Sequence, residues 1–93
     1  MKKEFYAVMG YQGKKSLEKR EGDYDETYQV YYSKTKDGWC ATDEFTGTSL
    51  VVAKSTKKEC QEGLKAIIDK VKEVRQGEKY LTGVINYREM LEK

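Results

Sequence analysis

The segment STKKECQEGLKAIIDKVKEVRQG, residues 55–77, decides the fold of this chain. Its opening, Thr56-Lys57-Lys58-Glu59, fits the S/T-x-x-E capping box that begins a helix. Apolar residues then recur at helical spacing and form one stripe: Cys60, Leu64, Ile67, Ile68, Val71 and Val74. Arg75 in the last turn and Gly77 just beyond it mark a C-terminal end. We therefore predict an amphipathic helix over about residues 56–76.

Four stretches upstream of this helix have the composition of β-strands, because β-branched and aromatic residues alternate or cluster in them. They cover residues 3–12, 27–33, 39–42 and 48–53. Asp37-Gly38 and the segment 43–47 supply turns that join the last three strands into an antiparallel meander, and the first strand is expected at one of its edges. The predicted fold class is α+β, with a four-stranded, mainly antiparallel sheet packed on one long helix and a short C-terminal helix.

Two segments lie outside this predicted core. Residues 13–26 form a highly charged run that begins at one glycine and holds a second, which indicates an exposed loop. Near the C-terminus, Asn86 can cap a short helical extension over about residues 84–92. Gly63, inside the long helix, indicates close packing against the sheet. With 93 residues, the chain is expected to form a single domain, 1–93.

Composition and charge indicate where the protein is located and which partners it binds. Charged residues make up 37% of the chain, and 18 Lys and Arg against 16 Asp and Glu give a net charge of +2. Residues 21–53 are acidic and both ends are mildly basic, so no concentrated basic face is evident. Neither a run of about 20 apolar residues nor a signal peptide is present. We expect a soluble, cytoplasmic protein that does not associate with membranes.

The residues for catalysis and metal binding are sparse. The chain has no His, and its two Cys, at 40 and 60, cannot fill a tetrahedral zinc site. Both are expected to be ordinary thiols, and the sequence does not show whether they are close in space. Asp23, Asp25 and Glu26 could coordinate a hard cation, but their loop lacks the Gly turn and distal Glu of a calcium site. We predict that the protein is not an enzyme and uses no cofactor or metal.

Eight Tyr and one Trp favour a binding surface. Exposed aromatic residues on a sheet stack nucleic-acid bases or anchor protein interfaces, whereas buried ones would build the core. We expect one sheet face to pack on the helix and the other to meet another macromolecule. The candidate partner-binding residues combine the charged loop with aromatic and basic residues of the strands: Lys14, Lys15, Lys19, Arg20, Tyr24, Tyr31, Lys34, Lys36 and Trp39.

The hairpin Tyr28–Thr42, the strand Thr48–Ala53 and the helix start Ser55–Cys60 together resemble the small N-terminal arm domains of phage and transposon integrases. That resemblance implies an AP2-like fold, in which a three-stranded sheet backed by one helix enters the major groove of DNA. Its contact candidates here are Lys34, Lys36, Trp39 and Lys54. In composition, the chain is also similar to accessory proteins of phages and mobile elements, among them anti-CRISPR inhibitors.

Taken together, the residues predict a non-enzymatic macromolecule-binding module with a protein partner. The compositional resemblance narrows this hypothesis to an inhibitor carried by a phage or mobile element. The alternative is a sheet-type DNA-binding domain. Both alternatives, and the oligomeric state, stay open at the level of sequence.

Overall fold

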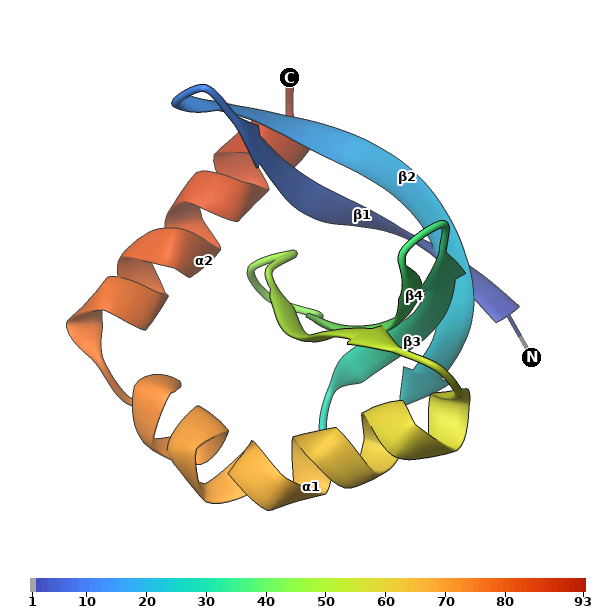
Figure 1. The fold of residues 1–93 in the computed structure, drawn as a ribbon. Coiled ribbons are helices and arrows are strands. Elements are labelled where there is room, and N and C mark those ends of the chain that lie inside the picture. The colour runs from blue at the N-terminus through green and yellow to red at the C-terminus, as the bar shows by residue number, and fades with distance from the viewer. Residues whose placement is uncertain (1) are drawn as a thin grey trace.

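A computed structural model describes residues 2–93 and shows an antiparallel five-stranded sheet followed by two helices (Figure 1). The strands neighbour one another in chain order. The elements are β1 (Lys2–Tyr11), β2 (Lys14–Asp25), β3 (Val30–Thr35), β4 (Gly38–Asp43), β5 (Ser49–Lys54), α1 (Lys57–Val74) and α2 (Glu78–Leu91). The fold is α+β, but the prediction of four strands is wrong because the sheet has five. Among the described residues, no helix is both long and apolar enough to cross a membrane.

The additional strand, β2, occupies the segment for which an exposed loop was predicted. Gln12 and Gly13 have φ values of 49° and 79°, and positive φ at both central residues makes the tight turn that suits a twisted hairpin. From there β1 and β2 pair without a break, back to Lys2 opposite Asp23. Of the 12 residues of β2, half are exposed and one is buried, so the strand lacks the apolar alternation by which a sequence reveals a strand.

The predicted long helix is confirmed as α1. The Thr56 side chain accepts a bond of 3.1 Å from the N–H of Glu59, and the Glu59 carboxylate accepts one of 3.2 Å from the N–H of Ser55. The main core lies between α1 and one face of the sheet, and consists of Val30, Tyr32, Ala41, Val51, Cys60, Leu64 and Val71. Ile67 and Val74 belong to the predicted apolar stripe but are 38% and 51% exposed. At Gly63, a Cβ would lie 3.3 Å from Val51 Cγ1, which accounts for the glycine.

The opposite face of β3 and β4 is covered by the hairpin of β1 and β2, which curls back over it (Figure 1). Phe5 stacks on Tyr31 with ring centroids 4.4 Å apart, and Ser33 and Thr42 are buried on the same face. Gly22 lies where β2 changes from pairing with β1 to pairing with β3, and a side chain there would collide with the Tyr32 carbonyl. The expectation of a free sheet face is therefore wrong, because the sheet bends sharply enough to cover itself.

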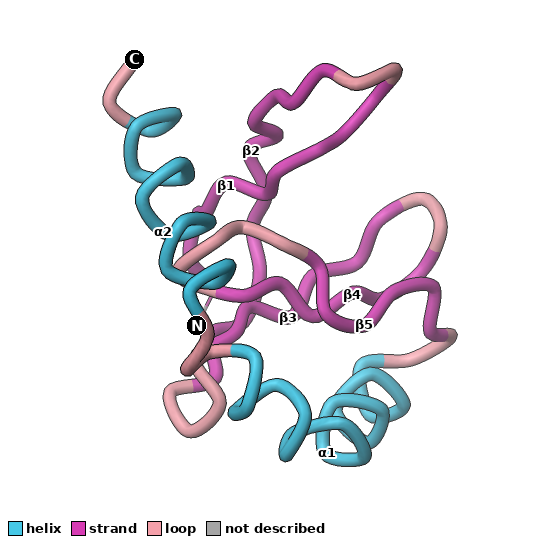
Figure 2. Tube along the Cα trace, turned by 90° about the vertical axis from the view of Figure 1, so that its left-hand side faces the viewer, coloured by secondary structure: helices cyan, strands magenta, loops and turns pink. Residues whose placement is uncertain are grey.

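Helix α2 begins at Glu78, six residues before the extension predicted over 84–92. Gly83 lies within the helix, although its position in the sequence suggested a break. The Tyr87 hydroxyl donates to the Tyr6 carbonyl of β1 at 2.6 Å, and α2 otherwise runs beside the sheet at an angle to α1 (Figure 2). This arrangement leaves a space between α2, the end of α1 and the strands.

Candidate binding pocket between α1, α2 and the strand edges

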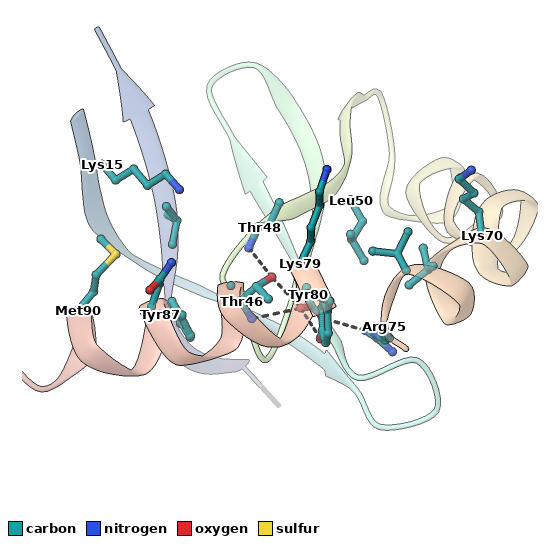
Figure 3. A pocket seen from close by; sticks show the side chains of 16 residues that line it. Lys15, Thr46, Thr48, Leu50, Lys70, Arg75, Lys79, Tyr80, Tyr87 and Met90 are labelled. Carbon is teal, nitrogen blue, oxygen red and sulfur yellow. Dashed lines mark hydrogen bonds and ion pairs between the residues drawn. The ribbon is translucent and has the colours of Figure 1, made fainter. Parts of the chain in front are cut away.

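A pocket of about 430 Å³ occupies this space (Figure 3). Its volume falls within the range of about 300–1,000 Å³ that is usual for ligand sites. The end of α1, one side of α2, β1 and the start of β5 all contribute to its walls. The apolar side chains that line it are Val8, Leu50, Val71, Val74 and Met90, with the rings of Tyr80 and Tyr87.

Asp43 lies at one wall of the pocket and holds three parts of the fold together. Its side chain is 1% exposed, and it accepts 2.7 Å bonds from Arg75 Nη2 and from the Thr46 hydroxyl. The Tyr80 hydroxyl donates to it at 2.8 Å and the Thr46 N–H at 3.1 Å. The strand β4, the residue that ends α1 and the first turn of α2 therefore meet at one carboxylate, whose charge is compensated within the chain.

Arg75, Tyr80 and Tyr87 place hydrogen-bond donors at the pocket wall. Arg75 Nη2 also donates to the Gln29 carbonyl at 3.3 Å, while its Nε–H is buried with no partner among the residues that the structure describes. Burial and the bond to Asp43 raise the pKa of Tyr80, and burial raises that of Tyr87. Both phenol O–H groups are donated within the chain, that of Tyr80 to Asp43 and that of Tyr87 to the Tyr6 carbonyl.

The rim of the pocket is basic. Lys15 of β2, Lys70 of α1 and Lys79 of α2 line it, all three are exposed, and none forms a salt bridge with another described residue. Figure 3 shows Lys15 and Lys70 at opposite ends and Lys79 between them. Among the described lining residues Asp43 is the sole acid, and Arg75 compensates it. The uncompensated charge around the opening is therefore positive.

Of the nine residues predicted from the sequence to bind a partner, Lys15 alone lines this pocket. Lys14 is exposed beside it at the start of β2. Lys19 forms an ion pair of 2.9 Å with Glu4, which raises the Lys19 pKa. Arg20 approaches Glu18 at 3.3 Å. The structure therefore spreads the basic residues of the predicted loop along β2 and directs one of them to the pocket.

The predicted aromatic contacts point into the molecule. Tyr31 stacks beneath Phe5, and its ring centroid lies 4.9 Å from that of Tyr24. The Tyr24 hydroxyl donates to the carboxylate of Glu44, and this bond, with burial, raises the Tyr24 pKa to about 12. These two tyrosines pack the inner side of the curled sheet.

The remaining predicted contacts lie at the far end of β3, β4 and β5. Lys34 stands opposite Trp39, and Trp39 opposite Lys54, so these residues form a row across three strands. Trp39 also packs on the main core, and Lys36 is exposed in the adjoining turn. The contact set of the DNA-binding alternative is thus brought together, away from the pocket.

The two thiols are buried in the fold, and two of the carboxylates considered as cation ligands, Asp23 and Asp25, have partners within the chain. Cys40 and Cys60 are buried and free, and burial raises the Cys60 pKa to about 11. Asp23 pairs with Lys57 at 2.9 Å. Asp25 accepts from the backbone N–H of two turn residues and from the Tyr32 hydroxyl. Within residues 2–93, no group of three or more potential ligands is placed to hold a metal ion.

Sequence reasoning missed most of the pocket. Lys70, Lys79, Asp43 and Arg75 come from segments that are far apart in the chain, and each looks like an ordinary surface or turn residue. A signal existed for α2, where Tyr80, Val84, Tyr87 and Leu91 follow helical spacing. That spacing predicts a buried helix face, but not the space beside it.

Comparisons with known proteins add no relative from which a function could be transferred. No protein-family model, no curated protein and no solved structure matches this chain. The resemblances to integrase arm domains and to anti-CRISPR inhibitors therefore stay predictions.

Proposed function

We propose that this protein is a non-enzymatic binding module that captures an acidic, apolar segment of a partner protein in the pocket between α1, α2 and the strand edges. The observation that carries this proposal is the pairing of apolar walls with three exposed lysines around the opening. Apolar side chains gain free energy by leaving water for such walls. Acidic residues next to the apolar ones in the partner would lie close to the lysines. Such charge complementarity speeds association and fixes the position in which the segment binds.

The spread of charge favours a protein segment over a small anion. Lys15, Lys79 and Lys70 come from three elements and follow one another along the pocket (Figure 3). A compact anion would meet one of these positions, whereas a chain with several carboxylates can meet them all. An inhibitor of phage or mobile-element origin, the narrower hypothesis, would use the same contacts to occupy a segment of its target.

The proposal is tested with a fluorescein-labelled synthetic peptide that repeats Glu-Glu-Leu-Leu, and its binding is measured by fluorescence anisotropy. Val74→Glu places a charge on the pocket wall, and the matched control Val52→Glu changes a similarly exposed valine outside the pocket. We expect Val74→Glu to weaken binding about tenfold or more. Val52→Glu should bind within about twofold of the unaltered protein. A peptide with lysine in place of glutamate should not bind.

Equal binding by both variants, or no binding of the acidic peptide to the unaltered protein, would contradict the proposal. The row of Lys34, Trp39 and Lys54 supports the DNA alternative, so labelled duplex DNA forms a second arm of the same measurement. DNA binding that weakens with salt and disappears on replacing Lys34 and Lys54 by alanine would favour that alternative.

A further inference from the structure

Strand β1 has an open stretch of edge beside the pocket. On its outer side, the Val8 N–H donates to the Gly47 carbonyl at 2.8 Å, and the Tyr6 carbonyl accepts from Tyr87 at 2.6 Å. In an antiparallel strand, the N–H and C=O of every second residue point to the same side. Because β1 and β2 pair in unbroken register, the N–H and C=O of Gly10 also point outward, away from β2.

The edge at Gly10 adjoins the basic end of the pocket. Gly10 is exposed, and a Cβ built there would meet nothing within 4 Å. Gly10 stands directly opposite Lys15 in the hairpin, and both Lys15 and Val8 line the pocket. No backbone hydrogen bond outside the β1–β2 ladder joins Gly10 to another described residue. Unpaired edges of this kind are templates for a further strand.

We propose that the acidic segment binds as an extended strand, which pairs with β1 beyond Val8 and places an apolar side chain in the pocket. This inference rests on the proposed function, because it concerns the same pocket and the same class of partner. In strand addition, backbone bonds supply affinity and alternate side chains supply specificity. Side chains of a strand reach the same side at every second residue, so a segment that repeats Glu-Glu-Leu-Leu presents a leucine and then a carboxylate to the pocket side. Lys15, opposite Gly10, is placed to meet such a carboxylate.

The test replaces Gly10, which has extended backbone within β1. Gly10→Pro removes the outward N–H and leaves the bonds to β2 in place, since proline is tolerated on an edge strand whose N–H faces outward. Gly10→Ala is the matched control, because its Cβ enters open space. With the glutamate–leucine peptide, we expect Gly10→Pro to weaken binding roughly 5- to 10-fold through the lost hydrogen bond. Gly10→Ala should remain within about twofold of the unaltered protein.

Hydrogen exchange on the unaltered protein gives a second readout that does not depend on how the proline variant folds. The Gly10 amide should exchange more slowly when the peptide is bound. If Gly10→Pro binds normally, or if Gly10 exchange is unchanged while Val74→Glu still abolishes binding, the pocket is used without strand addition and this inference fails. If the unaltered protein does not bind the peptide, the proposed function fails with it.

Discussion

Asp43 is the residue on which the corner between β4, α1 and α2 depends. Its carboxylate is bonded to Arg75, Thr46 and Tyr80, and Arg75 is 32 residues away in the chain. In the sequence, Asp43 is one of two adjacent acids in a turn. The pairing that makes it important is a long-range contact, which no local pattern encodes.

We expect Asp43→Asn to lower the free energy of unfolding by about 3–5 kcal/mol. The substitution keeps the side-chain volume but leaves the Arg75 guanidinium without a counter-ion, and the new amide presents a donor where donors already converge. Urea unfolding followed by Trp39 fluorescence measures the change. Asp69→Asn, on the exposed side of α1, is the control and should change stability by no more than about 0.5 kcal/mol. Equal effects of the two substitutions would show that the Asp43 cluster is not an anchor.

Helix α2 is held against the strands by hydrogen bonds from Tyr80 and Tyr87. The position of Tyr87 depends on the absence of a side chain at Gly47. Gly47 has φ +68°, and a Cβ there would lie 2.5 Å from Tyr87 Cε1 and 3.0 Å from Val8 Cγ2. The tyrosine ring therefore lies directly over the bare backbone of the β4–β5 connection. Any side chain at this position must push α2 away and open the pocket.

Gly47→Ala and Gly13→Ala separate this steric effect from backbone strain. Both glycines have positive φ, but a Cβ at Gly13 meets nothing within 4 Å. We expect Gly13→Ala to cost about 1–2 kcal/mol of stability from the left-handed backbone alone. Gly47→Ala should cost about 1–3 kcal/mol more, from overpacking. Urea unfolding gives the energies, and amide exchange in α2 should accelerate in Gly47→Ala alone. If both variants lose the same free energy of unfolding, α2 does not pack against Gly47.

The helices and strands differ in how clearly the local sequence predicts them. The capping box and apolar stripe of α1 are local, so the helix and its packed face follow from the sequence, with the exposed Ile67 and Val74 as exceptions. Strand β2 buries little of its surface, and it is held by hairpin pairing with β1. Because backbone pairing with β1 holds β2 in place, its side chains need not alternate between apolar and polar, and the periodicity that indicates a strand is missing.

At the scale of the whole molecule, the titratable groups make the free energy of unfolding greatest near neutral pH. The chain has no His, so few side chains titrate between about pH 5 and pH 9. Burial, with hydrogen bonds to carboxylates, raises the pKa of Tyr32 and Tyr80, and the bond to Glu44 raises that of Tyr24 to about 12. At the acidic end, a hydrogen bond from Lys57 lowers the pKa of Asp23.

The sign of each effect follows from which state holds the proton more tightly. The folded tyrosines keep protons that the unfolded chain releases near pH 10, so their contribution is complete below about pH 10 and is lost as pH rises through the folded values. The contribution of Asp23 is present above its unfolded pKa of about 4 and is lost as pH falls through the lowered folded value.

We therefore expect the urea midpoint to stay constant between about pH 6 and pH 8, to begin to fall above about pH 8.5, where the unfolded chain releases the Cys60 proton, and to fall more steeply above about pH 10. Tyr80→Phe should reduce the steepness of the alkaline fall, because it removes one group whose pKa is raised. Tyr6→Phe, at a tyrosine that is 40% exposed, is the control and should leave the slope unchanged. An alkaline fall of the same steepness in the unaltered protein and in Tyr80→Phe would contradict this account.

The residues of this chain by themselves determined the α+β class, the helix that begins after Thr56 and the hairpin between β3 and β4, because each rests on contacts within a few residues. Tertiary structure alone decided that β2 is a strand, that the curled sheet covers its own second face while α1 covers the first, and that Lys15, Lys70 and Lys79 line one pocket. These features arise where segments distant in sequence meet, and the free energy of such meetings depends on shape and burial that no local pattern records.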